Sequence, residues 1–131
     1  MEQRNVNPWT WQDEFGFSQA VEVSGHSRVL MCAGQTSSAA DGQVLHAGDM
    51  RAQVVQALDN LETVLAQANM SLSNVVRLNY YVTDIDAFFG AADALGERLG
   101  AAGIQPASTL LQVSRLAFPD FMFEVEATAM A

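Results

Sequence analysis

The chain contains no lysine and a single cysteine, Cys32, among its 131 residues. One cysteine can form neither an intrachain disulfide nor a paired-cysteine metal site. Cys32 lies in the apolar run Val29–Ala33, where a small buried hydrophobic residue is expected rather than a reactive thiol. His26 and His46 have no third ligand at metal spacing, so we predict two surface-loop histidines and no metal site.

Positive charge is scarce as well. Six arginines stand against fifteen acidic residues, which gives a net charge of −9 and an isoelectric point near 4.3. Nucleic-acid binding normally needs a basic surface that displaces counterions from the phosphates. The composition therefore disfavours a nucleic-acid partner and nuclease activity.

Long hydrophobic runs are missing too. No run approaches the roughly 18 apolar residues that span a bilayer, and the first residues lack a basic flank followed by an apolar stretch. We therefore expect a cytoplasmic protein with no membrane partner. Half of the residues are apolar, which indicates a substantial core, and the length predicts one domain over residues 1–131.

Hydrophobic periodicity predicts the elements. Alternation and turn residues indicate strands over 17–23 and 28–34, joined as a hairpin through Ser24–Ser27, and later strands over 74–83, about 107–115 and about 121–129. Three- and four-residue steps indicate a helix of about 20 residues from Asp49, a plausible N-cap. A second helix should start at Asp84 or Asp86 and end at Gly100–Gly103.

This order predicts an α+β fold, with a mixed β-sheet and two helices packed on one of its faces. Counting alternate residues from Arg77 places six further side chains on the open face: Ser108, Leu110 and Gln112 on one strand, and Met122, Glu124 and Glu126 on the next. Such a face is too apolar for water and too polar for a closed core. We therefore expect self-association to cover it.

Three stretches carry a family resemblance. They are Gly16–Ala20, Cys32–Gln35, and Pro106–Thr109 leading to Phe123–Ala127. In this order and spacing they resemble the Rid family of reactive-intermediate imine and enamine deaminases, also described as YjgF-like or L-PSP endoribonuclease-like proteins. The resemblance spans roughly Gly16 to the C-terminus. It implies a chorismate-mutase-like (Rid) fold, a homotrimer around a central barrel, no cofactor, and a small-molecule ligand in a cleft at each subunit interface.

The resemblance also implies a site. Glu124 matches the family glutamate that orients an attacking water, and Ala33-Gly34-Gln35 matches a Ser-Gly-Gln motif whose backbone approaches the ligand. Three further positions differ from many members: Phe17 stands at a tyrosine position, Ser108 at an arginine position and Leu110 at a cysteine position. An alternative role for Glu124 is a structural acid paired with Arg77 or Arg115.

The arginine position matters most, because deaminating members read Pro-Ala-Arg-Ser where this chain reads Pro106-Ala107-Ser108-Thr109. Hydrogen bonds to a charged partner are worth about 1.5–3 kcal/mol each, so losing a two-pronged clamp would weaken carboxylate binding by about one to three orders of magnitude. Arg77 or Arg115 could substitute.

We therefore predict a cofactor-free hydrolase that acts on a small reactive imine, enamine or related metabolite, and not an efficient 2-iminocarboxylate deaminase. The alternative is a non-catalytic trimer that binds or senses a small metabolite, and RNA cleavage is less favoured. Trp9 and Trp11 could line the cleft or anchor the N-terminal arm.

Overall fold

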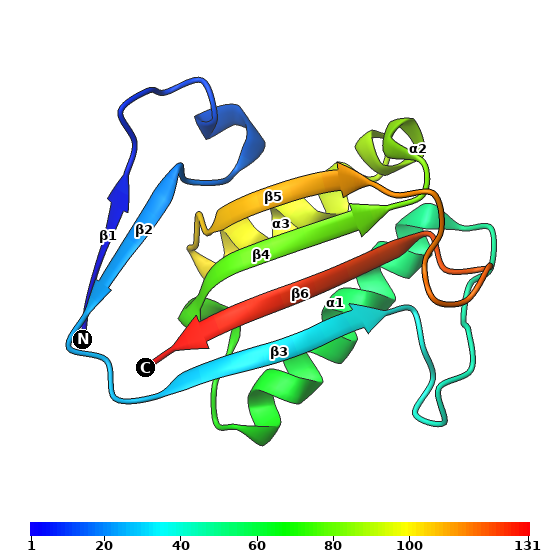
Figure 1. The fold of residues 1–131 in the computed structure, drawn as a ribbon, viewed down its shortest axis with the longest axis horizontal. Coiled ribbons are helices and arrows are strands. Elements are labelled where there is room, and N and C mark those ends of the chain that lie inside the picture. The colour runs from blue at the N-terminus through cyan, green and yellow to red at the C-terminus, as the bar shows by residue number, and fades with distance from the viewer.

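The chain is described from a computed structural model that covers residues 1–131 (Figure 1). Its strands are β1 (Glu2–Val6), β2 (Ala20–Ser24), β3 (Val29–Thr36), β4 (Val75–Val82), β5 (Ala107–Gln112) and β6 (Phe123–Met130). Its α-helices are α1 (Met50–Gln67), α2 (Ile85–Phe89) and α3 (Ala92–Ala102). The main sheet has the order β3-β6-β4-β5, in which β4 and β5 are parallel and β6 runs antiparallel to both of its neighbours. The predicted mixed α+β fold is confirmed.

The helices lie behind one face of this sheet (Figure 1). Helix α1 packs on β3, β6 and α3, and its apolar side contributes Leu58, Leu61 and Leu65, which have no exposed surface. The predicted cap is confirmed, because Asp49 Oδ1 accepts a hydrogen bond from the Ala52 amide at 3.0 Å. None of the helices combines the length and the apolarity needed to cross a membrane.

The predicted second helix is in fact two helices. Asp84 caps α2 by accepting a hydrogen bond from the Ala87 amide at 3.0 Å, and this short helix ends at Gly90. Helix α3 then ends at Gly103, whose φ of 70° is the left-handed conformation that glycine adopts without strain. The break gives α3 its own direction, along the strand β5 (Figure 1).

The predicted hairpin between the first two strands is wrong. Strand β2 pairs with β1, an N-terminal strand that was not predicted, and the two form a separate sheet beside the main one (Figure 1). Gly25 does turn the chain, with φ at 69°. However, the amides of Ser27 and Arg28 donate to the Ala131 carbonyl at 2.7 and 2.9 Å, which ties the start of β3 to the C-terminal end of β6.

One part of the predicted open face is confirmed and another part is wrong. Glu124 and Glu126 lie beside Tyr81 and Asn79, which point away from the helices as expected. Ser108, Leu110 and Gln112 instead lie beside the inward-facing Leu78, Tyr80 and Val82, so they face the helices. Met122 also packs against the core rather than standing free on the open face.

The cause of this error is register. Alternation assigns faces within one strand, whereas the relation between strands depends on which residues pair, and a shift by one residue reverses every side chain. Thr109 and Leu111 are therefore the β5 residues of the open face, since they pair with Asn79 and Tyr81.

Candidate functional site

The predicted site residues fall into two groups on opposite faces of the main sheet. Glu124 and the Ala33–Gln35 segment belong to the open face and the neighbouring edge strand β3. Phe17, Ser108 and Leu110 line a cavity on the helix side. A single chain therefore does not bring the two groups together.

The open-face group is built on a β-bulge. Cys32 pairs with Ala127, whereas Gln35 pairs with Val125, so Ala33 and Gly34 together stand opposite Glu126. This extra residue in β3 brings Gly34 under the side chain of Glu124. A Cβ atom at position 34 would lie 2.7 Å from the Glu124 carboxyl carbon and closer still to Oε2. Only glycine leaves room for the carboxylate in this position.

Glu124 has no partner in the chain. None of the ion pairs involves it. Arg77 donates to Asn79 Oδ1 at 3.3 Å, and Arg115 donates to the carbonyls of Leu116 and Ala117 at 3.2 and 3.3 Å. The alternative of a structural ion pair with Arg77 or Arg115 is therefore wrong for the single chain.

The surroundings of Glu124 raise its pKa. Partial burial is the main cause, because it disfavours the charged carboxylate, and the neighbouring Glu126 carboxylate adds repulsion. A carboxylate with a raised pKa and no committed partner is suited to take a proton from water.

Glu126 has the opposite environment. Its Oε1 accepts hydrogen bonds from the Tyr81 hydroxyl at 2.5 Å and from the Asn79 amide at 3.1 Å. Both bonds favour the ionised form and lower the pKa of Glu126. The environment therefore lowers the pKa of Glu126 and raises the pKa of Glu124. As a result, Glu126 stays ionised while Glu124 exchanges its proton more readily.

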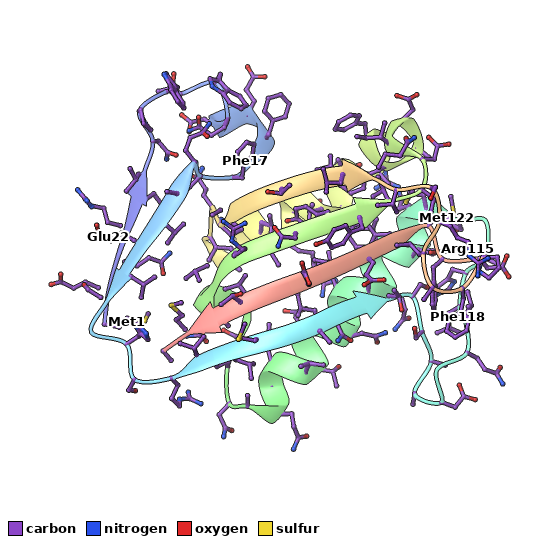
Figure 2. The ribbon with its side chains drawn as sticks, viewed as in Figure 1. Met1, Phe17, Glu22, Arg115, Phe118 and Met122 are labelled. Atoms are coloured by element: carbon purple, nitrogen blue, oxygen red, sulfur yellow. The ribbon has the colours of Figure 1, made fainter.

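The helix-side group lines a cavity of about 670 Å³ between β5, α3 and the segment that precedes β2. Figure 2 shows Phe17 at the end of that segment, above the start of β5. The lining consists of the following residues: Asp13, Glu14, Phe15, Gly16, Phe17, Tyr80, Phe88, Phe89, Ala92, Asp93, Leu95, Gly96, Leu99, Gly100, Ile104, Gln105, Ser108 and Leu110. It contains no arginine and no histidine.

Tyr80 is the residue of this cavity that sequence reasoning missed as a functional candidate. Its side chain is only 5% exposed, and its hydroxyl has no hydrogen-bond partner. Burial raises the pKa of this phenol, and the nearby Ser108 hydroxyl offsets a part of the increase, although the two groups are not at hydrogen-bonding geometry. A signal was present, because Tyr80 occupies an inward position that alternates with Leu78 and Val82 and would carry a polar atom into the core.

Within one chain, neither candidate substitute for the family arginine reaches the cavity. Arg77 and Arg115 are absent from its lining. Figure 2 shows Arg115 in the loop between β5 and β6, at the far end of the sheet from Phe17. The tryptophans are exposed to 60% and 59%, and neither lines the cavity, although the Trp11 ring packs edge-on against Phe17 at 5.9 Å.

The remaining predictions concern isolated residues. Cys32 is buried and unpaired, and burial raises the pKa of its thiol, so the prediction of a small buried residue is confirmed. His26 and His46 are exposed in loops, as predicted.

Comparison with known proteins is consistent across sequence and structure. The family model described as endoribonuclease L-PSP matches residues 12–131. A RutC family protein from Pyrococcus horikoshii is 30% identical over 113 residues, which is 86% of this chain and 85% of that protein. The crystal structure of YyfB from Yersinia pestis, a Rid family protein of unknown function, is 35% identical with a TM-score of 0.89 and full coverage of both chains. Rv2704 of Mycobacterium tuberculosis, a YjgF family member, is 27% identical with a TM-score of 0.67, covering 99% of this chain and 100% of that one.

Proposed function

The chain belongs to the endoribonuclease L-PSP family of Rid and YjgF proteins, and from this premise we propose that it is a cofactor-free hydrolase of small reactive imines or enamines. One observation carries the proposal. The Glu124 carboxylate lies over Gly34 without any ion pair, in surroundings that raise its pKa. A structural acid on a sheet would be expected to have a partner, as Glu126 does.

A complete site requires a second copy of the chain. Glu124 and Gly34 lie on one face of the sheet, and the cavity with Phe17, Ser108 and Leu110 lies on the other. In a homotrimer with a cleft at each interface, Glu124 of one subunit would meet the cavity of the next. The separation of the two groups within one chain supports this arrangement.

The reaction can be written with these groups alone. A water held by the Glu124 carboxylate attacks the imine carbon, and the carboxylate takes a proton as the new C–O bond forms. Glu124 passes this proton to the imine nitrogen, which gives a neutral carbinolamine. The regenerated carboxylate then takes the carbinolamine hydroxyl proton and delivers it to the nitrogen as the C–N bond breaks, so that an imine and water become a carbonyl compound and ammonia, and Glu124 ends as the carboxylate. The backbone near Gly34 would supply amides for developing negative charge.

RNA cleavage, which the family description names, is not favoured. Arg4, Arg51 and Arg98 are already held in ion pairs with acidic residues. The remaining arginines do not compensate for a net charge of −9, so no basic footprint for phosphates is available. A cytoplasmic location remains part of the proposal, in keeping with a lone, unpaired cysteine.

The test is turnover of an imine by the purified protein. An imine released in situ from benzylamine by a flavin-dependent amine oxidase should give benzaldehyde and ammonia faster than in water alone. Glu124→Gln keeps the size and hydrogen bonding of the side chain but cannot accept the proton. Loss of a general base costs about 10²–10⁴ in rate, which is the drop we expect.

Two further readouts separate catalysis from structure. The wild-type rate should fall as the pH drops through the raised pKa of Glu124, because only the ionised form accepts a proton. The folded chain binds this proton more tightly than the unfolded chain, so the ionised group lowers stability as the pH rises from the ordinary pKa through the raised one. Glu124→Gln should therefore not lower the melting temperature at pH 7. Ligand binding without any turnover would instead favour a binding or sensing protein.

A further inference from the structure

The charges around the cavity on the helix side favour an uncharged ligand over a carboxylate. No cationic side chain lines it, whereas Asp13, Glu14 and Asp93 are exposed at its margin. Arg51 binds Asp93 through two hydrogen bonds of 2.7 and 2.9 Å, yet Arg51 itself is not part of the lining. Within one chain, a ligand carboxylate would find no counter-ion in this lining and would be repelled by the exposed acids. An uncharged ligand meets neither penalty.

The size and the apolar lining of the cavity indicate what kind of ligand fits inside it. Aromatic and branched aliphatic side chains make up half of the lining residues, including Phe17, Phe88, Leu99 and Leu110. Its volume of about 670 Å³ lies within the roughly 300–1,000 Å³ typical of small-molecule sites. The ligand that fits should therefore have an apolar body.

Apart from the exposed Gln105 and the exposed acids, one polar pair interrupts this lining. Tyr80 places a buried hydroxyl without a partner next to Ser108. Ser108 Oγ donates to the Pro106 carbonyl at 3.1 Å, and its side chain is partly exposed to the cavity. A hydroxyl can accept a hydrogen bond while it donates one, so a rotation that turns the Ser108 hydroxyl toward a ligand can also place its oxygen where it accepts from Tyr80. The phenol then gains the acceptor that it lacks, and the serine becomes a stronger donor through the chained hydrogen bond.

We propose that the cavity binds a carbonyl or imine compound with an apolar body and no carboxylate, whose oxygen or nitrogen accepts a hydrogen bond from Ser108 while Tyr80 donates to Ser108 from behind. This inference rests on the proposed function, because it names the substrate class of the same site. Imines of this class arise when amines are oxidised, whereas 2-iminocarboxylates arise from amino acids. A reaction that oxidises an amine would therefore supply the substrate.

A matched pair of probes tests the class. Acetophenone and phenylglyoxylate are both aryl ketones and differ by a methyl group in place of a carboxylate. In NMR titrations of the native protein, acetophenone should bind at least tenfold more tightly than phenylglyoxylate. Ser108→Arg, which introduces a cation, should reverse this order.

Matched variants test the donor pair. Tyr80→Phe removes only the buried hydroxyl and should weaken acetophenone binding about two- to tenfold, the usual range for one hydrogen bond. It should not lower the melting temperature, because no hydrogen bond within the chain is lost. Thr63→Val is the control, since it removes an exposed hydroxyl on α1 that donates only to the Asp59 carbonyl and lies outside the cavity lining, and it should leave acetophenone binding unchanged, with assembly checked by light scattering.

Each other outcome overturns the proposal. These outcomes are no binding of acetophenone, equal or tighter binding of phenylglyoxylate by the wild type, or the same acetophenone affinity in Tyr80→Phe. The proposed hydrolase is judged separately, because imine turnover that depends on Glu124 would stand even if these binding results failed.

Discussion

Gly34 and Glu124 compete for the same space, because the Glu124 carboxylate lies where any other residue at position 34 would place its Cβ. The atoms that the Cβ would meet belong to the far end of a flexible side chain. A substitution there should therefore displace the carboxylate rather than disrupt the strand.

Gly34→Ala should lower imine turnover by about 10² while changing the free energy of unfolding by less than about 1 kcal/mol, because misplacing a reacting group by about 1 Å has an effect of this size. Turnover and urea unfolding measured on one preparation check both parts. If the two residues act as a unit, the double variant Gly34→Ala/Glu124→Gln should lose little more turnover than the single variant Glu124→Gln. Fully multiplicative losses would contradict the pairing.

At the level of the elements, Gln53 connects helix α1 to the chain that leads into β6. Its side chain is completely buried, donates to the carbonyls of His46 and Asp120 at 3.1 and 2.9 Å, and accepts from the Met122 amide at 2.8 Å. Met122 precedes Glu124 by two residues. This glutamine therefore fixes the start of the strand that carries the candidate base.

Gln53→Met, which retains the volume but not the amide, should lower the free energy of unfolding by about 3 kcal/mol, because it leaves buried backbone groups without partners. Chemical denaturation measures the change. Gln56→Met, three residues along the same helix and bonded only to the neighbouring Asn60, is a suitable control. A similar loss in both variants would show that the helix itself, and not this connection, had been weakened.

The same elements show what the sequence could and could not predict. The start of α1 at Asp49 could be predicted because helix capping depends only on residues close in sequence. The outward position of Glu124 could be predicted from the alternation of side chains within β6. The partners of β2 and the faces of Ser108 and Leu110 depend on register between distant strands, which no local pattern encodes. The Gln53 bonds and the orphaned Tyr80 hydroxyl are tertiary contacts as well, so the sequence could propose candidate site residues but not their arrangement in the fold.

For the whole molecule, the open face remains the strongest indication of assembly. Its most exposed apolar members are Met31, Val29 and Leu111, exposed to 83%, 49% and 49%, rather than the predicted Leu110 and Met122. They share the face with Arg77, Asn79 and the two glutamates. A surface of this mixed kind suits an interface between subunits.

The protein should behave in solution as a trimer, with three times the 14.1 kDa mass of the chain, because a closed ring covers all copies of this face. Light scattering at micromolar concentration measures the mass. Met31→Arg, which places a charge at the most exposed apolar residue, should shift the population toward monomers without unfolding the chain. A monomeric wild type would remove the proposed interface cleft altogether.

The bulge in β3 has a consequence beyond the position of Gly34. Strand β3 is an outer strand of the main sheet, and β2 leaves it uncovered. A long regular edge offers a template for uncontrolled strand addition and aggregation. The irregularity at Ala33–Gly34 interrupts that template, so the feature that makes room for the Glu124 carboxylate also protects the free edge from fibril-like growth.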